Sequence, residues 1–122
     1  MKYALAAFLW LHGFCHLVGF VVPWKIAKLP EEPYKTTLFM GRVDVGDAGI
    51  RVVGILWLLV ALAYGVCGAG VVMAKPWWIQ ATVFVSLFSL ALSVAGLPGS
   101  KFGIPVNVAL VTLLLLGKKG WW

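Results

Sequence analysis

The stretch "IRVVGILWLLVALAYGVCGAGVVM", residues 50–73, carries a single charged residue, Arg51, at its beginning. A helix needs about 20 apolar residues to cross a hydrocarbon core about 30 Å thick, and this run is long enough. Backbone polar groups in lipid must be satisfied within the segment, which favours a helix over an open strand. The run therefore predicts a membrane-spanning helix.

Three further apolar runs lie along the chain, and each ends at proline, glycine or lysine. The last holds about thirteen apolar residues, which is below the usual spanning length of about 17 to 25. Short connections between successive spans favour antiparallel neighbours. The sequence thus predicts an all-α fold with one transmembrane domain, residues 1–122, formed by an integral membrane four-helix bundle of up-down-up-down topology. The expected helices cover about 3–22, 50–73, 77–97 and 104–117, with a long polar connection at 23–49.

Composition agrees with lipid as the solvent. Hydrophobic residues make up 62% of the chain and charged residues only 11%, far from the balance of a soluble domain. The net charge is +6, but the basic residues are scattered singly between apolar runs. Because no basic stripe could follow a phosphate backbone, nucleic acid is not an expected partner. These bases are interpreted as anchors for membrane lipid headgroups.

The basic residues also bear on orientation. Lys2, Lys75, Lys118 and Lys119 fall on the face that carries both chain ends in such a bundle. Since cytoplasmic flanks are enriched in Lys and Arg, we expect cytoplasmic termini in a bacterial-type cytoplasmic membrane.

Two histidines stand in the first apolar run, "LWLHGFCHLVGF", residues 9–20. Residues four apart share one face of a helix, and the rise of 1.5 Å per residue places both near the middle of the membrane. Counting the same rise along the other runs puts hydrogen-bonding side chains at similar depth. A polar group in hydrocarbon is costly unless it is paired, so we expect these groups to converge on the bundle axis. The predicted polar layer consists of His12, His16, Tyr64, Ser86, Ser89 and Asn107.

Four roles are open to this layer. It could be a hydrogen-bonded core, because polar contacts between membrane helices often serve only cohesion. It could line a cavity for a lipophilic molecule with a polar head. His12 and His16 could ligate a metal or haem, although a zinc site needs further ligands. They could also relay protons, given the pKa of free histidine near 6.5.

A charged segment, "GRVDVGDAGIR", residues 41–51, precedes the second span. If it is helical, Asp44, Asp47 and Arg51 share one face, and one aspartate caps the helix. The alternative is a charged lid in which Arg42 or Arg51 holds a phosphate or carboxylate head.

Small residues indicate where helices touch. Ala61, Gly65 and Ala69 recur every four residues in the second run, as Cys15 and Gly19 do in the first. Such spacing lets helix backbones approach closely in lipid. Cys15 and Cys67 both lie within apolar runs and are expected to be buried free thiols.

The layout resembles the small four-helix membrane proteins grouped as DoxX-like. The resemblance rests on "LHGFCHLVGF", on "GDAGIRVVGILWLL" and on "KFGIPVNVALV". It implies a lipid or quinone-like ligand, or an accessory role in a larger membrane complex or homo-oligomer. The alternative is a membrane enzyme that acts on a lipophilic substrate, with His12 and His16 as acid–base groups or metal ligands. No motif identifies a cofactor.

Overall fold

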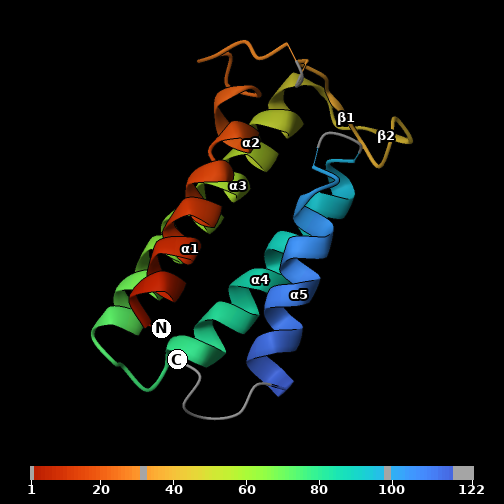
Figure 1. Ribbon diagram of the computed structural model, residues 1–122. Helices are drawn as coiled ribbons and strands as arrows, with labels where there is room; N and C mark the ends of the chain where they lie inside the picture. The colour runs from red at the N-terminus through yellow and green to blue at the C-terminus, as the bar shows by residue number, and fades with distance from the viewer. Residues whose placement is uncertain (1, 31–32, 98–99, 117–122) are drawn as a thin grey trace.

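The computed structural model describes residues 2–30, 33–97 and 100–116, and this part of the chain is mostly helical (Figure 1). Two two-residue strands pair antiparallel in the connection between the first and second predicted spans. The elements are α1 (Lys2–Cys15), α2 (Val18–Val21), β1 (Thr37–Leu38), β2 (Val43–Asp44), α3 (Gly46–Val72), α4 (Trp78–Ala95) and α5 (Gly103–Leu116).

Three helical stretches are long and apolar enough to cross a membrane. They are Lys2–Val21, which joins α1 and α2, then α3 with 27 residues and α4 with 18. The fourth apolar helix, α5, has 14 residues and is shorter, as its sequence predicts. Large apolar side chains lie exposed along these helices; Phe84 is 76% exposed and Leu116 is 79% exposed. Such a surface is suited to contact with lipid tails.

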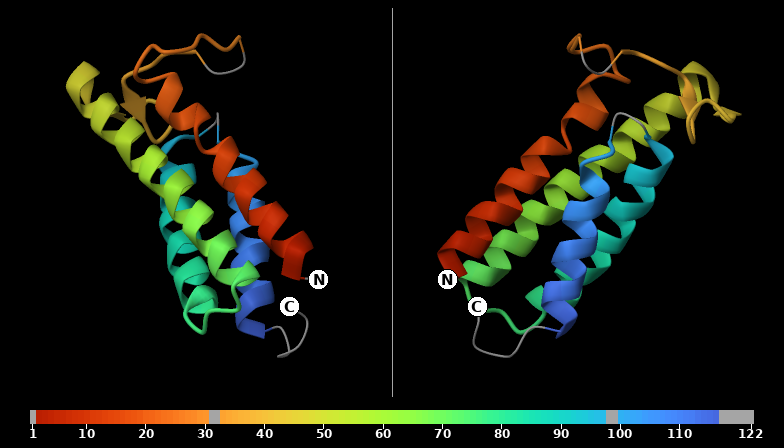
Figure 2. Two further views of the ribbon diagram at one scale, coloured as in Figure 1. Left: turned by 90° about the vertical axis from the view of Figure 1, so that its left-hand side faces the viewer. Right: turned by 45° about the vertical axis from the view of Figure 1, so that its right-hand side comes forward.

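The helices pack in two pairs. α1 lies along α3 and α4 lies along α5, and α3 also contacts α4 (Figures 1 and 2). The beginning of α1, the end of α3, the beginning of α4 and the end of α5 lie at one end of the molecule. The buried apolar core between the helices consists of Ala6, Leu9, Val60, Tyr64, Cys67, Val71, Trp78, Leu92, Leu110 and Leu114.

The first predicted helix is interrupted at His16. The backbone N–H of His16 bonds to the carbonyl of Gly13, and that of Leu17 bonds to Phe14, each three residues back rather than four. These bonds are of the tighter 3₁₀ type, which separates α1 from α2. The sequence predicted one continuous helix over 3–22, and nothing in the apolar pattern marks this break.

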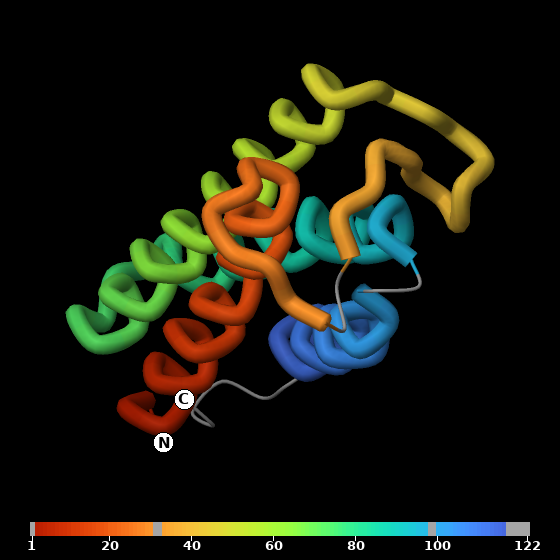
Figure 3. Tube along the Cα trace, turned by 90° about the horizontal axis from the view of Figure 1, so that it is seen from above, coloured from red at the N-terminus to blue at the C-terminus, as the bar shows by residue number. Residues whose placement is uncertain are grey.

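The connection after α2 is more ordered than its composition suggests. Leu38 pairs with Val43, and Gly41 in the intervening turn has a φ of +86°, which favours glycine. Figure 3 shows this segment crossing from the end of α2 to the end of α4, where the Phe39 N–H bonds to the Ala95 carbonyl at 2.8 Å. It therefore covers one end of the helix pairs.

The second spanning helix begins at Gly46, ahead of the predicted start near residue 50. Val45, rather than an aspartate, holds the cap position, and it makes no side-chain capping bond. Asp47 lies in the first turn of the helix, where an acid was expected. Asp44 lies in β2 rather than on a helical face with Asp47 and Arg51. Its carboxylate accepts hydrogen bonds from the Gly46 N–H at 3.0 Å and from the Thr36 hydroxyl at 2.9 Å, and so holds the strand end against the start of α3.

These bonds predict the pH range in which the strand end is held. The Gly46 N–H and then the Thr36 hydroxyl lower the pKa of Asp44, because both favour the carboxylate. The stabilisation is therefore present above the unfolded pKa and is lost as pH falls through the lower folded value. In an NMR titration in micelles, the Gly46 amide proton should shift with a midpoint below 3.8, the value of an unperturbed aspartate. Thr36→Val should raise that midpoint, and a wild-type midpoint at or above 3.8 would contradict the assignment.

Candidate functional site

The six side chains of the predicted polar layer are brought together. They come from every helix of the two pairs: His12 from α1, His16 from the turn after it, Tyr64 from α3, Ser86 and Ser89 from α4, and Asn107 from α5. Four of them are fully buried and His16 is 5% exposed. The hydrogen bonds below join all six into one network.

Asn107 is the centre of this network. Its Oδ1 accepts from His12 Nε2 and from the Tyr64 hydroxyl, each at 3.0 Å. Its Nδ2 donates to Ser89 Oγ at 2.9 Å. The Tyr64 oxygen also lies 2.9 Å from Ser86 Oγ. One amide thus joins α1, α3 and α4 to α5.

His16 uses both ring nitrogens. Nδ1 lies 2.7 Å from the His12 carbonyl oxygen, and Nε2 lies 2.5 Å from Ser89 Oγ. In a regular helix the His12 carbonyl would accept the backbone N–H of His16, but that N–H bonds to Gly13. The His12 carbonyl therefore accepts a hydrogen bond from the His16 side chain instead of from the His16 backbone. The helix break frees this carbonyl for the side chain.

If the network is neutral, the hydrogen-bond partners determine which ring nitrogen of each histidine carries the proton. A carbonyl can only accept, so His16 carries its proton on Nδ1, and Nε2 accepts from Ser89. Asn107 Oδ1 can only accept, so His12 carries its proton on Nε2. Tyr64 donates to the same oxygen and accepts from Ser86. The buried nitrogen and oxygen atoms of these side chains all have partners without a formal charge, which suits a low-dielectric interior.

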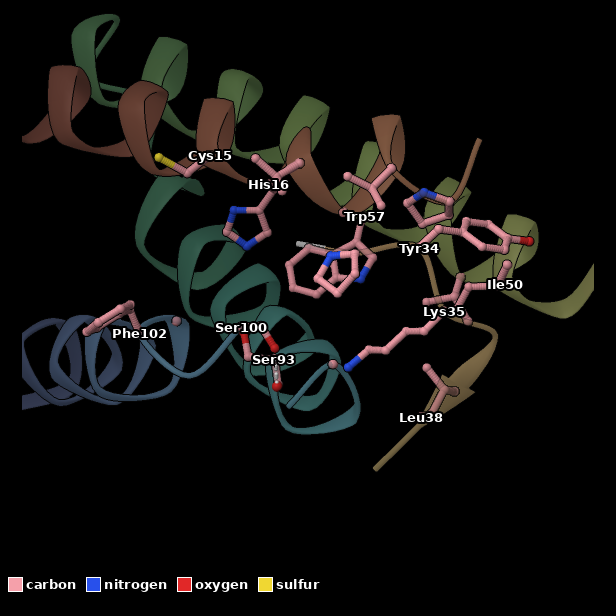
Figure 4. A pocket seen from close by; sticks show the side chains of 18 of the residues that line it. Cys15, His16, Tyr34, Lys35, Leu38, Ile50, Trp57, Ser93, Ser100 and Phe102 are labelled. Atoms are coloured by element: carbon pink, nitrogen blue, oxygen red, sulfur yellow. Dashed lines mark hydrogen bonds between the residues drawn. The ribbon is translucent and has the colours of Figure 1, made fainter. Parts of the chain in front are cut away.

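A cavity of about 380 Å³ adjoins this network. His12 and His16 belong to both, since they line the cavity as well as joining the polar layer. Figure 4 shows His16, Trp57 and Lys35 extending into the same space from different elements. Most of the lining is apolar, and it includes Val18, Val22, Ile50, Val53, Trp57, Phe102 and Val106. The volume lies in the range of about 300 to 1,000 Å³ that is typical of small-molecule sites.

Several lining residues were missed from the sequence. Trp57 packs with its indole centroid 5.2 Å from that of His16. Ser100 donates to the Ser93 carbonyl at 2.5 Å, and Lys35 donates to the Leu97 carbonyl at 3.3 Å. Lys35 and Ser100 lie in irregular connections, where no helical period places a side chain. The only signal for Lys35 is that the connection carrying it is unusually long.

The charged segment lies away from this cavity. Arg42, Asp44, Asp47 and Arg51 are absent from the described residues that line the cavity. Asp47 accepts a hydrogen bond from the Tyr34 hydroxyl, which raises the pKa of Tyr34. Arg51 lies over the Trp24 ring at 5.9 Å, as expected of a side chain that extends to a membrane interface. Among the described residues that line the cavity, the cation is Lys35 instead. Lys35 lies in the connection after α2, just before the hairpin formed by β1 and β2.

Within residues 2–30, 33–97 and 100–116, no group of three or more His, Cys, Asp or Glu side chains could hold a metal ion. His12 and His16 therefore offer two ligands from one stretch of chain, and the hydrogen bonds above already engage His12 Nε2 and both nitrogens of His16. Cys15 is exposed rather than buried as predicted, while Cys67 is buried. The arrangement is suited to hydrogen bonding more than to metal coordination.

Comparison with known proteins adds no relative to this description. No family model matches the chain, and neither a curated protein nor a solved structure matches it. The functional argument therefore depends on the cavity and the polar network themselves.

Proposed function

We propose that this protein spans a bacterial-type cytoplasmic membrane as an up-down-up-down four-helix bundle and binds a lipid or quinone-like molecule with a polar head. The three long apolar helices support the membrane location. The likeness to DoxX-like proteins in the first, second and fourth spans is consistent with a lipophilic ligand. Self-association, or docking to a larger membrane complex, would use the exposed apolar faces of the helices.

The observation that carries the ligand proposal is the cavity beside the histidines. A bundle built only for cohesion would fill this space with side chains, because protein interiors are packed as densely as organic crystals. Here the polar layer is satisfied internally, and the apolar space next to it stays open. An apolar space with a few polar groups at its ends suits an amphiphilic molecule.

For orientation, we propose that the end of the molecule formed by the start of α1 and the end of α3 faces the cytoplasm. Lys2 donates to the Val72 carbonyl at this end, at 3.3 Å, and Lys75 follows α3 directly. Lysines close to the ends of spans are the strongest determinants of cytoplasmic placement. The cavity, at the other end of the first helix, would then open toward the outer leaflet.

The ligand proposal is tested by filling the cavity. Val53 lines it, whereas Val52, the preceding residue on α3, is 59% exposed and does not. We expect native mass spectrometry of the wild type, released from mild detergent, to show a discrete lipophilic adduct. Val53→Trp should remove that adduct because the indole occupies the space, and Val52→Trp should retain it. A wild type without adduct after incubation with membrane lipid extract, or an adduct that survives Val53→Trp, would overturn the proposal.

A further inference from the structure

The cavity carries an unbalanced positive charge. Among the described residues that line it, Lys35 is the one with a full charge at neutral pH, and none is an acid. The side chain is half-buried and extends from the covering segment toward Ser93 and Ser100 (Figure 4). A charge at the border of an apolar space interacts more strongly than one in bulk water. The cavity is therefore electrostatically selective at this end.

The Lys35 ammonium has donors to spare. Its one hydrogen bond within the described residues is to the Leu97 carbonyl, at 3.3 Å, and an ammonium has three N–H groups. The two aspartates on the same connection have other partners, since Asp44 accepts from Thr36 and Gly46 and Asp47 accepts from Tyr34. Within the part of the chain that the structure describes, two N–H groups of Lys35 thus remain for an acceptor in the cavity.

A helix that begins beside the cavity has the same polarity. α5 begins at Gly103, and both Gly103 and Val106 of its first turn line the cavity. The N-terminus of a helix carries a partial positive charge, which favours a nearby anion. Lys35 and the start of α5 therefore act in the same direction on the head of a bound molecule.

The rest of the lining is suited to a hydrocarbon chain. Val18, Val22, Val53 and Trp57 are among the apolar residues that line the cavity together with His16 and Lys35. The volume of about 380 Å³ is near the lower limit for small-molecule sites, which favours one chain over two.

From these observations we propose that the site selects a single-chain lipid with an anionic head, carboxylate or phosphate, held by Lys35. This inference rests on the proposed function and narrows it from a polar-headed lipophile to an anion. The hydrogen bond of Lys35 to Leu97 also holds the covering segment to the connection after α4, and the test below separates that structural role from head-group binding.

The test compares three probes with the same chain: oleate, 1-oleoyl lysophosphatidate and oleyl alcohol. Binding is measured by native mass spectrometry of the full-length protein in mild detergent. We expect the wild type to bind one or both anions at least about tenfold more tightly than the alcohol, because a charge-assisted hydrogen bond is lost with the neutral head. Whether oleate or the phosphate binds more tightly identifies the head group.

Three variants test whether the preference for anions depends on the Lys35 ammonium. Lys35→Met keeps the length of the stem and should reduce anion binding to the level of the alcohol without weakening the alcohol. Lys35→Arg should retain the preference, and Arg42→Met, which removes an exposed charge away from the cavity, should leave it unchanged. If Lys35 only holds the connection after α4 in place, Lys35→Met should weaken the binding of all three probes equally, and this would overturn the inference.

The wild-type comparison stands even if Lys35→Met does not fold. Equal binding of anions and alcohol would refute anion selection while leaving the proposed lipophile site intact. Absence of binding by all three probes would refute the proposed function as well.

Discussion

Replacing Asn107 with leucine should lower the free energy of unfolding by about 3 kcal/mol. Leucine is similar in size and suits the helix, so the cost arises from lost hydrogen bonds rather than lost volume. Asn107 makes three bonds, to His12, Tyr64 and Ser89. Single bonds between membrane helices average about 0.6 kcal/mol, but leaving a buried donor unpaired costs about 1 to 3 kcal/mol. The His12 N–H and the Tyr64 hydroxyl would both lose their acceptor at once.

The measurement is reversible unfolding in mixed detergent micelles, followed by far-ultraviolet circular dichroism. Thr112→Val is the matched control on α5, because the one bond of its hydroxyl among the described residues is to the Val108 carbonyl of its own helix. We expect that control to stay within about 0.5 kcal/mol of the wild type. A loss for Asn107→Leu no larger than the control's would show that the network does not hold the two helix pairs together.

A double-mutant cycle adds a sharper test of the same network. Ser89→Ala removes the acceptor of Asn107 Nδ2 and the donor to His16 Nε2. Because Asn107 and Ser89 share a bond, their combined substitution should cost less than the two single losses added together. Strict additivity would mean that the two side chains act independently.

The polar layer was predictable because hydrocarbon leaves polar groups few alternatives. Counting the helical rise from the chain ends placed Tyr64, Ser86 and Asn107 at similar depth, and the structure joins them directly or through one partner. Depth alone could not show that Asn107 would be the centre. Asn107 is central because α5 lies against α4 and faces α1. The pattern of apolar residues does not predict this arrangement of the helices.

The cavity was not predictable for a different reason. Its lining includes residues on both sides of the turn at His16 and residues of the segment at 33–38. Both features depend on backbone hydrogen bonds that vary little with side-chain type. The sequence offered Arg42 or Arg51 as the holder of a head group only as an alternative to helix-start chemistry, whereas Lys35 reaches the cavity from an irregular connection.

The prediction from small residues was partly confirmed. The face of α3 that carries Ala61 and Gly65 does meet α1, where the Trp10 indole donates to the Gly65 carbonyl at 3.0 Å. A tight approach of α1 to α3 lies at Gly13, however, and Cys15 is exposed. A recurring small residue indicates the face of contact but does not indicate which residue is at the point of contact.

Gly13→Ala should therefore destabilise the protein by about 2 kcal/mol. An added Cβ at Gly13 would lie 2.7 Å from Tyr64 Cβ and 3.1 Å from the Ala61 carbonyl oxygen. Neither of these atoms can move unless α3 moves, since one is backbone and the other is fixed to it. Displacing Tyr64 would also lengthen its bond to Asn107, so we expect the loss to be partly non-additive with Asn107→Leu.

Gly65→Ala is the matched control, because it makes the same chemical change in the facing helix. A Cβ at Gly65 would meet no atom within 4 Å, and alanine is the better helix former by about 0.5 to 1 kcal/mol. We therefore expect unchanged or slightly increased stability in the same detergent unfolding experiment. Opposite signs for the two substitutions would place the contact between α1 and α3 at Gly13. If Gly65→Ala were the more damaging change, the regular spacing on α3, rather than the point of backbone contact, would determine how these helices pack.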